Sequence, residues 1–119
     1  FGIAGHLLEM CRASGLRADV RFNDLPLIAR ARELAQEGVA TGASTRNWAS
    51  YGSEVDVPAD LPAWQHKLLT DPQTSGGLLV ACAPDAVAAV QACVERVQGN
   101  AATVVGRFMR GEARLHVSA

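Results

Sequence analysis

The sequence has little lysine and no cluster of basic residues. Of its 119 residues, 11 are lysine or arginine; Lys67 is the only lysine, and the arginines form no run or stripe. The formal net charge is −1. A nucleic-acid-binding protein normally carries a basic patch that neutralises phosphates, so this class of function is disfavoured and no nucleic-acid partner is expected.

Long apolar runs are also missing. No stretch approaches the roughly 20 apolar residues that a transmembrane helix needs, and no basic region precedes an apolar one as in a signal peptide. The cysteines Cys11, Cys82 and Cys93 are odd in number, and none has a partner at zinc-ligand spacing. We therefore predict three buried, reduced thiols, no metal site, no membrane partner and a cytoplasmic protein.

Recognisable catalytic arrangements are absent as well. His66 and His116 have no partner at metal or triad spacing, and no Ser-His-Asp or Cys-His set can be assigned. We interpret both histidines as surface or interface residues. No catalytic residue is expected in this chain.

The sequence does contain enough apolar material for one core. Apolar residues make up 49% of the chain, and 119 residues suit a single domain, residues 1–119. Because Phe1 and Gly2 lead directly into a helical pattern, we expect this domain to be a piece of a longer protein.

Hydrophobic periodicity predicts helices that alternate with strands. Apolar residues recur at helical spacing in residues 3–14, whereas Ala18, Val20 and Phe22 alternate with polar residues as in a strand. Residues 78–83 (LLVACA) are continuously apolar and predict a buried central strand. The expected helices are 3–14, 27–37, 44–50, 61–69 and 85–98, and the expected strands are 17–22, 55–58, 78–83, 102–109 and 113–117.

This order of elements predicts an α+β fold. The natural arrangement is an α/β two-layer sandwich, in which a mixed, largely antiparallel sheet of about four strands carries helices on one face. A tight turn at Arg110 and Gly111 would join the last two strands as a hairpin, which favours antiparallel pairing.

The loop at residues 70–77 (TDPQTSGG) has the most unusual chemistry. It combines a carboxylate, a carboxamide and hydroxyls with Gly76 and Gly77, which could adopt φ > 0 and bring backbone amides close to a ligand. Such donors suit phosphate oxygens. A turn that ends a helix and starts a strand would use the same residues, so both interpretations stand. The loop is not of the Walker type, because no lysine follows the last glycine.

Two further segments could contact an anion. Gly2, Gly5 and His6 lie at a helix entry, where free amide groups attract negative charge. Close packing by Gly5 and an ordinary first-turn histidine are the alternative. Arg46 and Asn47, in the sequence GASTRN, could reach an anionic ligand. A solvated loop arginine and a helix cap are the alternative there.

Together these segments resemble the selenophosphate synthetase family. Residues 69–79 (LTDPQTSGGLL) resemble its DPQTSGGLL signature, and residues 1–6 (FGIAGH) resemble the end of its TDVTGFGLLGH segment. Residues 42–47 resemble its GGTxRN loop, with Ala43 in place of the second glycine. The order and spacing agree over essentially the whole chain. The last two patterns also occur, more loosely, among aminoimidazole ribonucleotide synthetase-like proteins.

The resemblance implies the C-terminal domain of an enzyme that converts ATP, selenide and water into selenophosphate, AMP and phosphate with Mg²⁺. It implies homodimers, and a separate N-terminal domain that carries the reactive residue and the metal ligands. This chain alone would then be inactive and would hold no tightly bound cofactor. The residues expected to line one wall of the active-site cleft and contact phosphate are Gly2, Gly5, His6, Arg46, Asn47, Asp71, Gln73, Thr74, Ser75, Gly76 and Gly77.

Two other functions remain open. Another aminoimidazole ribonucleotide synthetase-like enzyme, such as a hydrogenase-maturation protein, would share the fold but not the dependence on selenide. A free-standing domain that binds a small molecule or a protein would have no catalytic partner.

Overall fold

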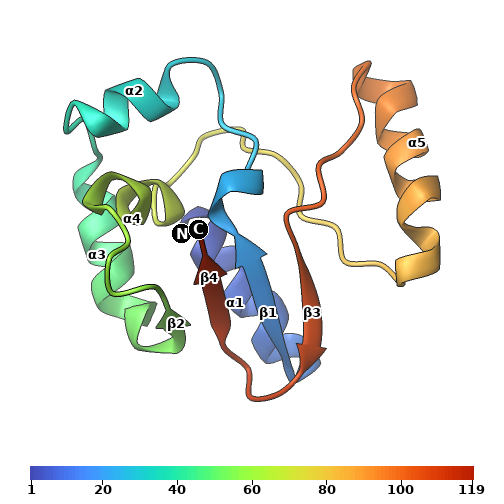
Figure 1. Cartoon of the computed structure of the whole chain (residues 1–119), viewed down its shortest axis with the longest axis horizontal. Helices are drawn as coiled ribbons and strands as arrows, with labels where there is room; N and C mark the ends of the chain where they lie inside the picture. The colour runs from blue at the N-terminus through green and yellow to red at the C-terminus, as the bar shows by residue number, and fades with distance from the viewer.

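The computed structural model describes residues 1–119, and its centre is a four-stranded sheet in the order β2-β4-β1-β3 (Figure 1). The strands are β1 (Leu16–Arg21), β2 (Val55–Asp56), β3 (Gly106–Arg110) and β4 (Leu115–Ser118). The helices are α1 (Gly2–Ser14), α2 (Ala31–Gln36), α3 (Gly42–Tyr51), α4 (Ala63–Leu69) and α5 (Val87–Gln98). Short 3₁₀ helices cover Phe22–Asp24, Gly52–Glu54 and Pro84–Ala86. None of the helices has the length and apolar character needed to cross a membrane.

The sheet is mixed but mostly parallel, so the prediction of a largely antiparallel sheet is wrong. β1 pairs antiparallel with β3, whereas the β1–β4 and β2–β4 pairings are parallel. The predicted hairpin is wrong for the same reason, because β1 lies between β3 and β4. The connection at residues 111–114 is long enough to cross two strand spacings, about 10 Å, past the end of β1.

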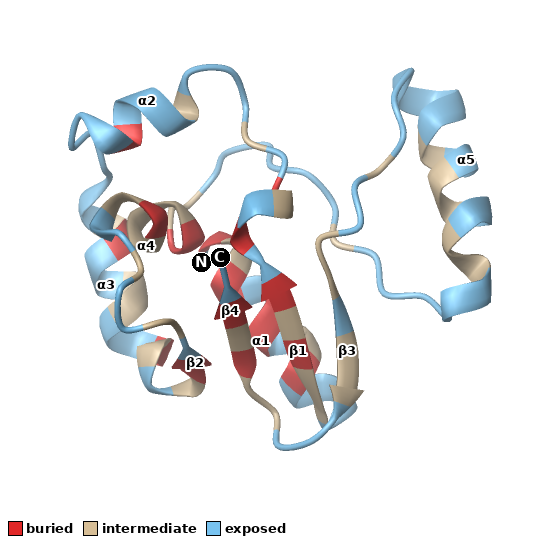
Figure 2. Cartoon of the chain, in the orientation of Figure 1, coloured by how far each residue is buried: buried red, intermediate tan, exposed pale blue.

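Helix α1 packs on β1 and β4, and its apolar stripe forms the centre of the core (Figure 2). Ala4, Leu8 and Cys11 of α1 have no exposed surface. The helix ends at Gly15, whose φ of 65° gives the left-handed cap expected of a glycine there. The buried cluster consists of Ala4, Leu7, Leu8, Cys11, Ala18, Val20, Phe22, Leu25, Tyr51, Val55, Leu69, Leu115 and Val117.

Helices α3 and α4 pack on α1 and on each other, and α2 packs on α4. The helix predicted at residues 27–37 begins only at Ala31. The helix cannot extend back through Arg30, because this residue has a left-handed backbone conformation with φ of 65°. The other four helix predictions are confirmed, with shifted ends, and α5 ends at Gln98 with Gly99 as its cap, as expected.

Residues 78–83 form no strand, so the predicted buried central strand is wrong. The segment is extended chain outside the sheet, Leu78 is 89% exposed, and only Leu79 packs against the core. A continuous apolar run forms a central strand only when other layers cover both of its faces, and here nothing covers them. The prediction that Cys82 is buried is also wrong, because its thiol is exposed.

Helix α5 stands apart from the sheet, on the far side of β3 in Figure 1. It has no buried residue, and Cys93 on it is exposed, contrary to the prediction of a buried thiol. A hydrogen bond from Gln91 Nε2 to the Ala102 carbonyl, 2.8 Å long, ties the helix to the chain that returns to β3. The prediction that the helices cover one face of the sheet is therefore wrong for α5.

Candidate functional site

The three segments singled out in the sequence meet at Thr70, the residue that follows α4. A Cβ atom placed on Gly2 would lie 2.6 Å from the Thr70 carbonyl carbon, so the start of α1 is in close contact with this residue. From α3, the Ser44 hydroxyl is hydrogen-bonded to the Thr70 hydroxyl, and Asn47 Nδ2 donates to the Thr70 carbonyl at 2.9 Å. The loop at residues 71–77 leaves from the same point.

Ser44 and Thr70 form a buried polar junction between α3 and α4. Each has only 1% of its surface exposed. The Ser44 hydroxyl lies 3.0 Å from the Lys67 carbonyl, and the Thr70 hydroxyl lies 3.2 Å from the carbonyls of His66 and Lys67. The Lys67 carbonyl also accepts from the Thr70 backbone N–H at 3.3 Å, so the two hydroxyls add polar contacts at the end of α4 and are themselves satisfied there.

The loop that follows is exposed from Gln73 to Gly77. The side chain of Asp71, at the start of the loop, accepts a hydrogen bond from the Thr41 hydroxyl, with 3.2 Å between Oγ1 and Oδ1. The residue with a positive φ in this loop is Ser75, at 55°, and neither glycine lies in that region, contrary to the sequence-based prediction. A Cβ on Gly77 would meet nothing within 4 Å, and one on Gly76 would meet only the Gln73 side chain, at 3.2 Å. The backbone geometry of this loop therefore does not itself require the two glycines.

The two candidates on α3 have different surroundings. Asn47 is half-buried and bonded to Thr70, whereas Arg46 is exposed. Neither residue caps α3, because the helix already begins at Gly42. Of this pair, only the Arg46 side chain is free to meet a ligand without breaking the junction.

The two candidates near the start of α1 are engaged with neighbours. His6 is exposed, and its Nδ1 lies 3.2 Å from Glu9 Oε2 on the next turn. Gly5 is buried, and a Cβ atom there would lie 2.6 Å from Phe1 Cβ and 3.1 Å from the Tyr51 ring. Gly5 thus allows α3 and the start of the chain to approach α1 closely. A shallow pocket of about 170 Å³ is lined by Phe1, Gly5, Glu9, Arg12, Ser50 and Tyr51.

Sequence reasoning missed Ser44, Thr70 and Tyr51 as residues that hold these segments together. The Tyr51 hydroxyl donates to the Phe1 carbonyl, and burial raises the pKa of this hydroxyl. The only signal in the sequence was a hydroxyl residue within two of the motifs, Ser44 in residues 42–47 and Thr70 in residues 70–77. Such residues form turns and caps so often that the pairing of Ser44 with Thr70 could not be read from spacing.

The aromatic contact beside the junction also joins α3 to α4. The Trp48 and His66 rings lie 3.9 Å apart, edge to face. Burial, and to a smaller extent the charge of Lys67, lowers the pKa of His66. Lys67 itself donates to the Thr45 hydroxyl at 2.8 Å.

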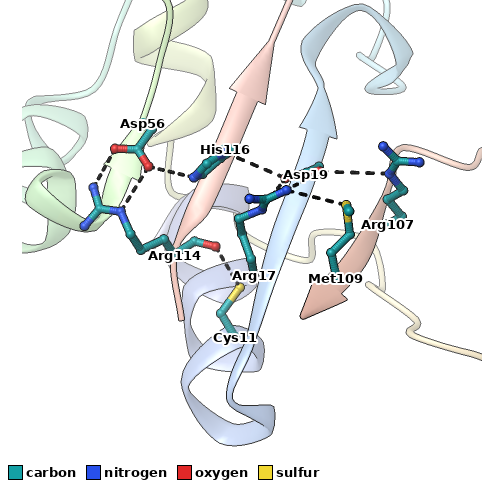
Figure 3. Close-up of polar contacts among 8 residues, drawn as sticks. All are labelled: Cys11, Arg17, Asp19, Asp56, Arg107, Met109, Arg114 and His116. Atoms are coloured by element: carbon teal, nitrogen blue, oxygen red, sulfur yellow. Dashed lines mark hydrogen bonds and ion pairs between the residues drawn. The ribbon is translucent and has the colours of Figure 1, made fainter. Parts of the chain in front are cut away.

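A second polar cluster crosses the sheet on the strands' outward-facing side chains (Figure 3). Asp56 accepts two hydrogen bonds from Arg114, and His116 Nε2 lies 2.9 Å from Asp56 Oδ2. Asp19 on β1 pairs with Arg17 at 2.9 Å and lies 3.9 Å from Arg107 of β3. The carboxylates that flank His116 come from other strands, which sequence spacing could not reveal. No group of three or more His, Cys, Asp or Glu side chains could hold a metal ion.

The chain is similar to known proteins over nearly its whole length. The chain is 50% identical to the selenide, water dikinase of Dechloromonas aromatica over 117 residues, 98% of this chain and 34% of that protein. It is 52% identical to the enzyme of the same name from Burkholderia pseudomallei over 118 residues, and 50% identical to that from Rhizobium meliloti over 117. The chain thus spans about a third of the length of these relatives. Residues 1–117 match the family described as AIR synthase related protein, C-terminal domain, and the chain therefore belongs to that family.

Proposed function

We propose that this chain is the C-terminal third of a selenide, water dikinase. The full-length enzyme would form selenophosphate, AMP and phosphate from ATP, selenide and water. In that enzyme the chain would form one wall of the active-site cleft, packed against its own N-terminal domain in a cytoplasmic homodimer. The observation that carries this proposal is the convergence of the three motif segments on Thr70.

In this proposal the wall binds phosphate oxygens rather than performing proton or covalent chemistry. The exposed hydroxyls and amides of residues 74–77 would donate to a phosphoryl group or to the selenophosphate product, and Arg46 would supply a positive charge. Phosphoryl transfer depends mainly on positioning and on stabilising negative charge, so donors of this kind contribute without a nucleophile among them.

The chain's own residues do not fit a resident metal ion. The acidic side chains of the described residues form no metal-binding group, and the one carboxylate of the loop, Asp71, is already bonded to Thr41. The Mg²⁺ that accompanies ATP in the reaction would therefore be held by side chains outside this chain.

The test is AMP formation by the full-length enzyme with and without selenide. Selenide-dependent cleavage of ATP to AMP, with selenophosphate detected by ³¹P NMR, supports the proposal. A rate of ATP cleavage that does not depend on selenide points to another aminoimidazole ribonucleotide synthetase-like reaction. An absence of any ATP cleavage points to a binding domain.

A further inference from the structure

We propose that Ser44, Asn47 and Thr70 are positioning residues that fix the start of the 71–77 loop, and that Asn47 does not contact the ligand. This inference rests on the proposed function and divides its candidate residues into two kinds. One kind holds the wall in place, and the other, which includes Arg46 and residues 74–77, faces the ligand.

The first argument is that the hydrogen-bonding groups at the junction are already used. The Asn47 amide donates to the Thr70 carbonyl at 2.9 Å, and the Ser44 and Thr70 hydroxyls bond to each other and to carbonyls at the end of α4. A ligand that recruited Asn47 would leave the Thr70 carbonyl without this donor in a half-buried position. Removing one partner of such a bond leaves the other group unpaired, which opposes the rearrangement.

The second argument is that Thr70 cannot shift independently of α1. The Gly2 backbone, with φ of 71°, lies against Leu69 and Thr70 so closely that a Cβ on it would come within 2.8 Å of the Leu69 carbonyl oxygen. Thr70 is therefore held between the starts of α1 and α3, both of which belong to the motif segments that meet there. The loop at residues 71–77 therefore starts from a fixed position, although residues 73–77 themselves are exposed.

The third argument is the contrast between adjacent residues on α3. Asn47 points to the junction and Arg46 is exposed, although both were candidates for the same role. Since the reacting groups of phosphoryl transfer must be held to within about 1 Å, a loop with a fixed origin serves a ligand better than a free one.

The experiment uses the full-length enzyme and compares Thr70→Val with Thr70→Ser. Valine keeps the shape of threonine without the hydroxyl, whereas serine keeps the hydroxyl. We expect Thr70→Val to lower kcat at least tenfold with KM for ATP within about twofold, and Thr70→Ser to restore kcat to within about threefold of the parent. Thr103→Val, the same change at an exposed position outside the site, is the matched control and should leave both constants unchanged.

Kinetics of Asn47→Ala separate a positioning role from a ligand contact. If Asn47 acts by holding the Thr70 carbonyl, Asn47→Ala will lower kcat and leave KM for ATP within about twofold of the parent, because the ligand contacts remain. A rise in KM with kcat unchanged would overturn the proposal.

Limited proteolysis of the same full-length variants gives a readout that does not depend on activity. Cleavage within residues 73–83 should accelerate at least fivefold in Thr70→Val and stay at the parent rate in Thr70→Ser. Unchanged cleavage in Thr70→Val overturns the positioning role. Faster cleavage in an enzyme without selenide-dependent activity would leave the positioning role standing and reject the proposed function instead.

Discussion

At the scale of single residues, the glycines of the motif segments have separable roles. Gly2 has a positive φ and lies against the Thr70 backbone, so its missing side chain is a requirement of packing. Gly77 has neither property, since its φ is not in the left-handed region and a Cβ on it would point into open space. A glycine that the fold does not need is a candidate for close approach by a ligand.

Gly77→Ala should leave the stability of the protein unchanged and lower the turnover of the full-length enzyme by roughly ten- to a hundredfold, because a methyl group would displace the phosphate that we propose to bind at the loop amides. Gly2→Ala should instead destabilise the fold by about 2 kcal/mol or more, since it adds a clash to an unfavourable φ. Urea unfolding and steady-state kinetics of both variants check this. Full turnover in Gly77→Ala would show that no ligand approaches that residue.

His66 gives a prediction about pH. Its pKa in the folded state is lowered by burial, so below about pH 6.5 the unfolded chain binds this proton more readily than the folded one does. Stability is therefore complete above that pH and declines as the pH falls towards the lowered folded pKa. His66→Gln should lose less stability than the parent between pH 7.5 and pH 5.5. Because both proteins keep His6 and His116, the difference in their urea midpoints isolates His66.

At the scale of elements, the layer formed by α1 on the sheet contains most of the core, whereas residues 78–98 contain none of it. Leu8 of α1 has no exposed surface and Leu78 is 89% exposed, although both lie in strongly apolar sequence. The same substitution at these positions therefore measures which segment belongs to the folded core.

Leu8→Ala should destabilise the protein by about 2–5 kcal/mol, because it removes a buried side chain and leaves a cavity. Leu78→Ala should change the free energy of unfolding by less than about 0.5 kcal/mol, as expected of an exposed position. Chemical denaturation of the two variants makes the comparison. A loss for Leu78→Ala close to that of Leu8→Ala would place residues 78–83 inside a sheet after all.

The elements also show what the sequence could and could not predict. Helix α1 and strand β1 were predictable, because an apolar stripe and an alternating pattern each fix one buried face. The pairing of β1 with both β3 and β4 was not, because pairing depends on contacts between segments that no local pattern encodes. The motif segments could be found as candidates from their chemistry. The difference between Asn47, which is hydrogen-bonded to Thr70, and Arg46, which is not, depends on how α3 packs against α4. It could not be predicted from the sequence.

At the scale of the whole molecule, the accessible surface is large for the chain. It amounts to 7582 Å², whereas a compact monomer of this mass has roughly 6,200 Å². The excess agrees with the position of α5, which stands away from the sheet without a buried residue. Backbone hydrogen bonds in such a helix are supported by few tertiary contacts.

Hydrogen exchange should therefore divide the molecule into two parts. Amides of α1, β1 and β4 should exchange only on global unfolding, whereas those of α5 should exchange many times faster through local opening. Mass spectrometry of peptides covering residues 2–21 and 87–98 of the 119-residue chain makes the comparison. Equal protection in the two regions would mean that α5 is packed against the rest of the protein in solution.

The central position of β1 has a consequence for biosynthesis. This strand is translated roughly 85 residues before the first of the two strands that hydrogen-bond to its edges, β3 and β4. At ordinary ribosomal speeds β1 waits on the order of 5–15 s with both edges unpaired. Nascent chains that stall within this interval would expose the edge that later accepts β4, and they are the species on which chaperones would be expected to act.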